Sequence, residues 1–416
     1  MSEETRVYTY RWAVLLVFGL IFMVGQMMWL TFSLIRNEAA PVFGLATTDA
    51  SIVLLTASQP LAFIILSIPI GWLADRKGLV IVAGLGAILQ VLFGALRIFV
   101  LNDFLMIFMC QFGLSIGSVM IQNCIVYLSV SWFPKGERGL ATGVSTLFML
   151  LGMLLGTALS LILWTAPLYE APGFTVPLAQ ANIESILYLD TIVAVILTVA
   201  FFAVARDKPP TPPDIDVLAE ATPSVRNMLK DRNVWFIALG FFAGFGIFIG
   251  LTAIIEELLI SLALPVLGAV MVMVLLMVFG IIGAIVVPAI SDKVQRRKPF
   301  LMVSLIVGTI FTWLVGTSTI IEFTYISSAI LGFFLISVMP IALSMLEEFK
   351  TVGPDLAGAS TGLAFWFGNL GGFLGTILLE TLRVGDSYFY SIVYLVVVMV
   401  IATVLIMTIP ETGKKD

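Results

Sequence analysis

A long hydrophobic segment ends with Gly71-Trp72-Leu73-Ala74-Asp75-Arg76-Lys77-Gly78, in which an aspartate is followed by a short basic turn. A later hydrophobic segment ends in a similar way with Ser291-Asp292-Lys293-Val294-Gln295-Arg296-Arg297-Lys298. The two aspartates are 217 residues apart in a chain of 416 residues. The same pattern therefore occurs twice, about half a chain apart, which indicates an internal duplication.

Two further landmarks repeat at similar distances. Arg11-Trp12 corresponds to Val234-Trp235 at an offset of 223 residues, and Ala141-Thr142-Gly143 corresponds to Ser360-Thr361-Gly362 at an offset of 219. Near-constant offsets are typical of a parallel repeat of two halves.

The composition excludes a water-soluble globule. The chain is 60% hydrophobic and 11% charged, whereas soluble domains carry about 25% charged residues. A helix needs ~20 mostly apolar residues to cross the hydrocarbon layer. Twelve such stretches are predicted, at about 12–35, 51–73, 79–101, 104–130, 139–165, 182–205, 233–257, 265–290, 299–317, 319–346, 357–380 and 387–409. The first is too long for a signal-peptide core, and we expect it to be retained.

One long polar segment, residues 206–232, interrupts this pattern, and it holds five prolines among its charges. We therefore expect an N-terminal six-helix bundle over residues 1–205, a cytoplasmic linker over 206–232 and a C-terminal six-helix bundle over 233–416. The predicted fold is an all-α membrane protein with twelve transmembrane helices in two pseudo-symmetric bundles.

The basic residues predict the orientation. Eighteen of the 21 fall in the tails and the even-numbered turns, and the three left on the other side are Arg36, Arg97 and Arg383. Cytoplasmic loops carry an excess of lysine and arginine, so we expect both termini in the cytoplasm of a multi-pass protein of the plasma membrane.

The residue inventory argues against catalysis. The chain has no histidine, and its two cysteines, Cys110 and Cys124, lie in the same predicted span. No nucleophile–base pair and no metal-ligand cluster is visible, so we expect no enzyme activity, cofactor, metal site or nucleic-acid partner. We expect a monomer that handles a small molecule in the bilayer.

The segment 71–78 resembles the signature between helices 2 and 3 of the major facilitator superfamily, and Trp132-Phe133-Pro134-Lys135-Gly136-Glu137-Arg138-Gly139 resembles that superfamily's turn before helix 5. The signature usually continues with basic residues, where this chain has Leu79 and Val80. The resemblance implies the major facilitator fold and transport by alternating access.

In that family the signature is thought to act as a latch that stabilises the outward-open state. By this resemblance we assign a gating role to Asp75 and Arg76, and to Asp292 and Arg296 in the second copy. An aspartate at such a helix end can pair with arginine and accept hydrogen bonds from a helix N-terminus. The alternative is that these basic residues only set topology and bind anionic lipid.

A substrate site is expected near the midplane, lined by spans 1, 4, 7 and 10. Polar groups in lipid are costly unless they face a partner or a wet cavity. The candidates are Gln26, Trp29, Gln111, Ser115, Gln122, Asn123, Phe245, Phe248, Thr252 and Tyr325, with Trp366 and Asn369 in span 11. Helix–helix hydrogen bonds and core packing explain the same residue types, so both interpretations stay open.

Charged residues within or near the spans are expected close to their ends: Arg97, Asp190, Glu256, Glu257 and Glu322 outside, and Glu347 and Glu348 inside. An uncharged aromatic cavity favours a neutral solute or an organic cation, because ring faces attract ammonium groups. Glu256 is the candidate for coupling to a proton or sodium ion, and an interfacial anion is its alternative.

Span 5 carries Gly152 and Gly156, and span 11 carries Gly368, Gly371, Gly372 and Gly375. Such small faces suit close approach of helices. They indicate either a sliding seam between the halves or static packing.

A narrower resemblance concerns the first span. Arg11-Trp12-Ala13-Val14-Leu15-Leu16, followed by Trp29-Leu30-Thr31-Phe32-Ser33, is similar to the feline-leukaemia-virus-receptor branch, whose members move choline and have been linked to haem. The resemblance matches Trp29 to a choline-contacting tryptophan. The branch has a glutamine in helix 5 and a tyrosine in helix 7. In this chain the corresponding positions fall at Leu150 and near Ile249, so both residues differ.

The first span also resembles prokaryotic cyanate-permease-like members. The predicted function is a secondary active or facilitative transporter of a small organic solute. A carrier of a small organic anion, such as cyanate or a monocarboxylate, and a non-transporting solute sensor are the alternatives.

Overall fold

The computed structural model describes residues 6–46, 49–134, 137–163, 176–211, 213, 225–265, 267–352 and 356–412. Within this part the regular elements are helices, apart from an isolated bridge between Val384 and Ser387. Among the described residues, twelve helices are long and apolar enough to cross a membrane. The predicted all-α class with twelve spans is confirmed.

The chain divides into two compact units, Met1–Glu220 and Ala221–Asp416. The dividing point lies within residues 206–232, the predicted linker, of which residues 212 and 214–224 fall outside the described residues.

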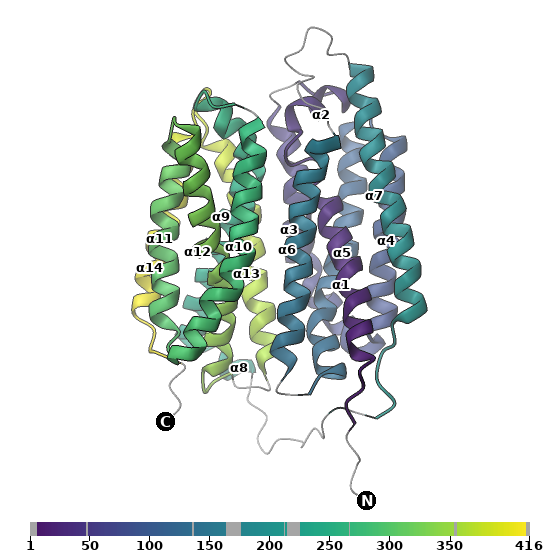
Figure 1. Ribbon diagram of the computed structural model, residues 1–416, viewed down its shortest axis with the longest axis vertical. Coiled ribbons are helices and arrows are strands. Elements are labelled where there is room, and N and C mark those ends of the chain that lie inside the picture. Colours follow the sequence, from purple (N-terminus) through teal and green to yellow (C-terminus); the bar gives the residue numbers. More distant parts are fainter. Residues whose placement is uncertain are drawn as a thin grey trace, which may run out of the picture. The chain divides into compact units, whose positions relative to one another are not determined.

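The first unit, drawn in purple to teal in Figure 1, contains eight elements within the described residues. They are α1 (Arg11–Trp29), α2 (Arg36–Val42), η1 (Ala50–Val53), α3 (Leu54–Lys77), α4 (Leu79–Phe99), α5 (Phe104–Trp132), α6 (Arg138–Leu163) and α7 (Val176–Val204).

The second unit, drawn in green to yellow in Figure 1, contains seven helices within the same part of the chain. They are α8 (Val225–Met228), α9 (Arg232–Ser261), α10 (Leu267–Val294), α11 (Lys298–Thr317), α12 (Ile321–Glu348), α13 (Ala357–Thr381) and α14 (Phe389–Met407).

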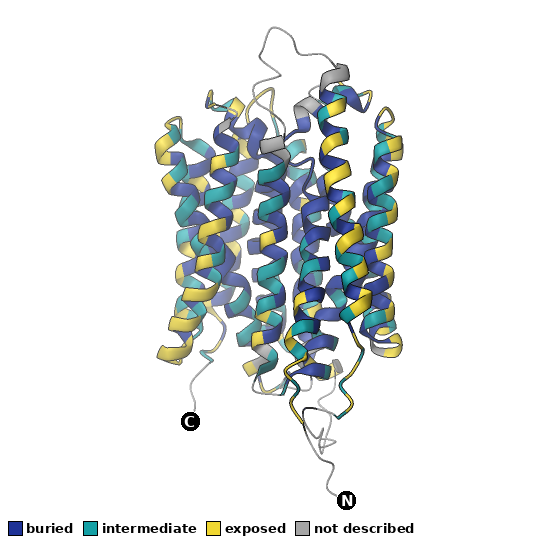
Figure 2. Ribbon diagram, turned by 45° about the vertical axis from the view of Figure 1, so that its right-hand side comes forward, coloured by how far each residue is buried: buried dark blue, intermediate teal, exposed yellow. Residues whose placement is uncertain are grey.

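Long helices suit these sequences because a helix satisfies its own backbone hydrogen bonds, which lipid cannot do. Large apolar side chains are exposed along many helices, as the yellow residues in Figure 2 show. Ile68 and Phe99 are 76% and 77% exposed, which a lipid solvent tolerates and water does not. The most buried spans are α1 and α9, the first of each unit.

The first span differs from the prediction. It was expected to continue to residue 35, but α1 ends at Trp29, and a turn then leads to the short helix α2. Local side-chain chemistry accounts for the break: Ser33 donates a hydrogen bond to the Leu30 carbonyl, and the Thr31 hydroxyl donates its one proton to Asp190 of α7. The bond from Ser33 to the backbone competes with helix propagation.

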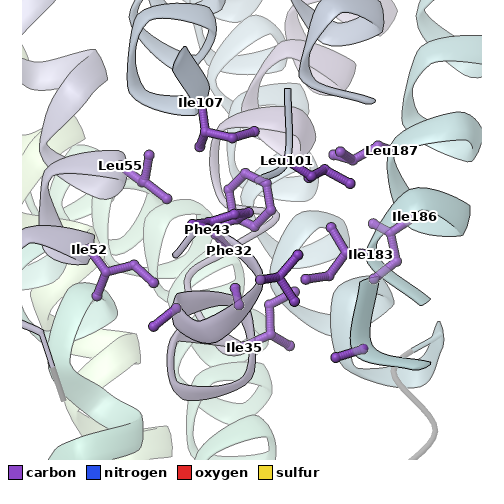
Figure 3. Packing of buried hydrophobic residues seen from close by; sticks show 14 residues of the cluster. Phe32, Ile35, Phe43, Ile52, Leu55, Leu101, Ile107, Ile183, Ile186 and Leu187 are labelled. Carbon is purple, nitrogen blue, oxygen red and sulfur yellow. The ribbon is translucent and has the colours of Figure 1, made fainter. Parts of the chain in front are cut away.

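An apolar cluster holds the chain after this break in place. Phe32 and Ile35 pack with Phe43 of the turn after α2, and with Leu101, Ile107, Ile183, Ile186 and Leu187 from the ends of α4, α5 and α7 (Figure 3). The rings of Phe32 and Phe43 meet edge to face at 5.3 Å. Burial of these apolar side chains stabilises the chain after the break.

Close glycine contacts repeat in the two units. A Cβ on Gly152 or Gly156 of α6 would overlap the carbonyls of Met23 and Met27 in α1. In α13, a Cβ on Gly371 would overlap the Phe242 carbonyl, and one on Gly375 would lie 3.2 Å from the Gly246 carbonyl. Each of these four residues of the second unit lies 219 positions after its counterpart in the first (371 − 152, 375 − 156, 242 − 23 and 246 − 27). The duplication therefore includes a backbone contact, and the glycine faces pack inside their own units, as static packing predicts.

We expect Gly152→Ala to destabilise the protein by about 1–3 kcal/mol, because the new methyl group collides with a backbone carbonyl that cannot rotate away. The measurement is the melting temperature of the purified protein in detergent. Gly143→Ala in the same helix is the matched control, since a Cβ there meets nothing within 4 Å, and alanine is the better helix former. Equal melting temperatures for the two variants would contradict the close contact.

Candidate functional site

The broken end of α1 is satisfied by side chains from other helices. Arg97 Nη1 of α4 donates to the Met28 carbonyl at 3.0 Å and to Gln111 Oε1 at 3.0 Å. Gln111 Nε2 of α5 in turn donates to the Trp29 carbonyl at 2.9 Å. The carbonyls at a helix C-terminus have no partner within the helix, and a positive charge is favourable there. Arg97 and Gln111 therefore cap α1 inside the apolar layer.

Asp190 of α7 supplies the opposite charge. Its Oδ2 lies 3.9 Å from Arg97 Nη2 and accepts a 2.7 Å hydrogen bond from the Thr31 hydroxyl. Both charged residues are buried, at 0% and 4% exposure, and the guanidinium lies over the Phe32 ring. The sequence predicted that these two charged residues lie close to the ends of their spans, but it did not predict that they are buried. The available signal was Arg97 itself, an arginine on the side that the topology rule leaves poor in basic residues.

Trp29 is held by its polar edge. Its indole N–H donates to the Thr56 carbonyl of α3 at 2.9 Å, and the residue is 3% exposed. The indole N–H is therefore already hydrogen-bonded within the protein, so a ligand would contact Trp29 through its ring.

Next to it, Gln59 Nε2 of α3 donates to Gln26 Oε1 of α1 at 3.0 Å. Ser115 of α5 bonds Ser58 of α3 at 2.9 Å. The structure thus gathers Gln26 and Trp29 of α1 with Gln111 and Ser115 of α5, and α3 supplies partners for three of them.

Gln122 and Asn123 lie farther along α5. Asn123 donates to the Val119 carbonyl of its own helix and is half-buried, and its Oδ1 lies 3.5 Å from where a Cβ on Gly71 would be. Gln122 is buried. At 1.5 Å per residue, both are roughly 10 Å along the helix axis from Ser115, so they form a separate group.

The second unit contributes aromatic rings. Phe245 stacks with Phe248 at 6.4 Å and meets Phe365 of α13 edge to face at 6.5 Å, while Phe241 meets Phe365 at 5.7 Å. Gly368 makes room for this cluster, because a Cβ there would lie 3.0 Å from the Phe245 ring. The cluster joins α9 to α13, and sequence reasoning identified Phe245 and Phe248 but missed Phe365.

Polar candidate residues of this unit donate hydrogen bonds to backbone carbonyls of their own helices. Thr252 donates to the Phe248 carbonyl and Asn369 Nδ2 to the Phe365 carbonyl, both from buried positions. Trp366 packs edge to face on Phe367. Tyr325 lies apart from the rings: its hydroxyl is next to Gly268, near the start of α10. Glu256 is buried in α9, one turn beyond Thr252.

The first predicted latch is described only in part. Asp75 belongs to α3, but its side chain lies outside the described residues. The guanidinium of Arg76 lies 3.7 Å from the centre of the Trp72 ring. Gly78 adopts φ +84°, a conformation that favours glycine. Asp207 accepts a 2.7 Å bond from the Val80 amide at the start of α4.

At the second predicted latch, Arg297 rather than Arg296 lies next to the aspartate. Asp292 pairs with Arg297, which also bonds Glu348 of α12 at 3.0 Å. Within the described residues the structure records no such pair for Arg296. Glu411 accepts bonds from the amides of Arg297 and Lys298 at 2.8 and 3.1 Å, and so caps α11. Burial acts to lower the pKa of Arg297, but the bonds to Glu348 and Asp292 outweigh it and raise the pKa above its ordinary value.

A family model described as Major Facilitator Superfamily matches residues 14–376. The chain belongs to this superfamily. Its members and its fold are those of transporters, not of enzymes, so transport of a small molecule across a membrane is its general activity.

Several relatives are similar over most of the chain. A solute carrier family 49 member 4 homolog of Xenopus tropicalis is 25% identical, over 90% of this chain and 85% of its own. A choline/ethanolamine transporter of Danio rerio is 22% identical (87% and 78%), and one of Felis catus is 25% identical (90% and 68%). The solved structure of a bacterial homolog of the human lysosomal transporter Spinster, inward-facing and occupied, is 15% identical with a TM-score of 0.73 over 97% of both chains. Alternating access fits this inward-facing neighbour.

We expect Asp190→Asn and Arg97→Met each to destabilise the protein by about 3–5 kcal/mol, since each leaves one buried charge without its partner. The double variant should cost less than the sum of the two. The measurement is a double-mutant cycle on unfolding in detergent. Asp386→Asn is the control, because Asp386 pairs with Arg383 at an exposed site and should change little. Strict additivity would mean that the buried charges do not interact.

Proposed function

We propose that the protein is a secondary active or facilitative transporter that moves a small organic solute, neutral or cationic, across the plasma membrane, with both termini in the cytoplasm. We further propose that it acts as a monomer, that a proton or sodium ion could couple through Glu256, and that nucleic acid plays no part. The division into bundles 1–205 and 233–416 joined by a linker belongs to the same proposal.

The proposal of a neutral or cationic solute rests on the pairing of Arg97 with Asp190. Among the described residues, α1, α5, α9 and α12 hold no arginine or lysine between their terminal turns. Arg97 enters from α4, and its charge is balanced by Asp190. An anionic solute would have to compete with this carboxylate, whereas the aromatic rings of Trp29, Phe245 and Phe248 suit an ammonium group.

The relatives support the same choice, because two of those described above bear the name choline/ethanolamine transporter. We therefore propose choline and ethanolamine as first probes. The amides of Gln26, Gln111, Gln122 and Asn123, with Ser115, Thr252, Tyr325, Trp366 and Asn369, complete the proposed site.

Uptake by proteoliposomes tests the proposal. Choline, ethanolamine, a neutral polyol and a monocarboxylate are supplied in turn, with and without a proton or sodium gradient. Accumulation of the amines or the polyol is the expected result. Uptake of the monocarboxylate alone would favour the anion carrier instead, and binding of a probe without flux would favour the non-transporting sensor.

We expect Trp29→Ala to lower uptake at least roughly tenfold, because the ring face is lost, while Trp29→Phe keeps a ring and most of the activity. Uptake rates are measured at matched protein levels. Trp313→Ala is the control, since Trp313 is 38% exposed on α11. Unchanged uptake by Trp29→Ala would remove this residue from the site.

We expect Arg297→Gln to slow transport and to bias the protein toward the inward-open state. The substitution removes the ion pairs with Asp292 of α10 and Glu348 of α12, which link the ends of these two helices. Arg296→Gln should leave both unchanged. Accessibility of single cysteines introduced near each end of the spans reports the bias. Equal effects of the two substitutions would mean that net basic charge, not the latch, matters.

A further inference from the structure

The two amides of Gln26 and Gln59 are incompletely paired. They share one hydrogen bond of 3.0 Å, although two carboxamides placed side by side can form two. The Gln26 Nε2 and Gln59 Oε1 atoms are buried and have no hydrogen-bond partner. The residues are 0% and 4% exposed, so bulk water does not satisfy these groups either.

This conclusion does not depend on how the amide atoms are assigned. Oxygen and nitrogen of a glutamine side chain are easily exchanged. If both amides are turned over, the shared bond persists, and one carbonyl and one NH2 group are again left open. In both cases, one free donor and one free acceptor flank the single hydrogen bond between the two amides.

Two other buried glutamines of the first unit have hydrogen-bond partners within the chain. Gln90 Nε2 donates to Ser118 at 3.0 Å, and both ends of Gln111 are bonded, to Arg97 and to the Trp29 carbonyl. The amides of Gln90 and Gln111 thus differ from those of Gln26 and Gln59. An unpaired buried polar group destabilises the fold, so its presence at Gln26 and Gln59 calls for a partner that comes from outside the chain.

We propose that Gln26 and Gln59 form a subsite for a hydroxyl group of the transported solute. This inference rests on the proposed function and adds Gln59 to the proposed site. A hydroxyl donates and accepts through one atom, so it can accept from the free NH2 group and donate to the free carbonyl. An ammonium group only donates and a carboxylate only accepts, and each would leave one amide atom open.

The position supports this assignment. Gln26 lies one turn before Trp29 on α1, and Gln59 lies three residues after Thr56, whose carbonyl holds the Trp29 indole. Gly152 lets α6 approach here, because a Cβ on it would lie 2.9 Å from Gln26 Cβ. The amide pair and the Trp29 ring therefore present a polar and an aromatic contact one helical turn apart, which suits a solute with a hydroxyl at one end and an apolar or cationic group at the other.

The first test needs no knowledge of the solute. The double variant Gln26→Met/Gln59→Met keeps side-chain volume and removes both open groups, so we expect the melting temperature of the ligand-free protein to rise by on the order of 2 °C. Gln90→Met should lower it, because Ser118 loses its partner. A fall for the double variant would show that the amide pair is structural and would overturn the inference.

The second test compares matched probes in the full-length protein. Choline and ethanolamine are set against trimethylpropylammonium and propylamine, in which a methyl group replaces the hydroxyl. The wild type should prefer the hydroxylated member roughly tenfold, and Gln59→Met should abolish this preference while Gln90→Met keeps it.

Equal use of both members of each pair by the wild type would overturn the hydroxyl assignment, and would mean that water or nothing fills the site. Failure of the wild type to bind or move any probe would count against the proposed function, and the melting temperatures would still decide the subsite. The two failures are thereby distinguished.

Discussion

A helix that stops within an apolar solvent leaves carbonyl oxygens that nothing around it can satisfy, and α1 stops at Trp29. The first unit meets this constraint with Arg97, whose charge then requires Asp190, which in turn takes a hydrogen bond from Thr31 just after the break. Gln111 closes the group by bonding both Arg97 and the Trp29 carbonyl. The position of Trp29, and with it that of the proposed site, follows from this chain of contacts. A buried ion pair is seldom a net source of stability, and here it is explained by the helix end that it caps.

The sequence was sufficient for the architecture because lipid imposes strong rules. Length and hydropathy predicted twelve spans, and the repeated landmarks predicted two related halves. The same rules apply poorly to individual side chains. Nothing in the local pattern distinguishes Gln111, which is fully bonded, from Gln26, which is not, since the partners of each come from other helices. Arg97 was expected at the membrane edge because it lies near a span end, whereas its burial depends on where α1 breaks. The choice of Arg297 over Arg296 as the partner of Asp292 likewise depends on the exact turn after α10.

The duplication preserved the packing and changed the chemistry. At the offset of 219 that relates the glycine contacts, Gln26 corresponds to Phe245 and Trp29 to Phe248. The first unit thus has an amide and an indole at positions where the second has phenyl rings.

The glycine contacts have a mechanical consequence. Where backbone rests on backbone, as at Gly152 on Met23 and at Gly371 on Phe242, there is no side chain whose rotation can absorb a shift between the two helices. Helix α1 must then travel with α6, and α9 with α13, as inseparable pairs. The proposed site residues of α1 and α9 are carried by these pairs, so substitutions there can suit a different solute without altering the backbone contacts that make each pair move as one body.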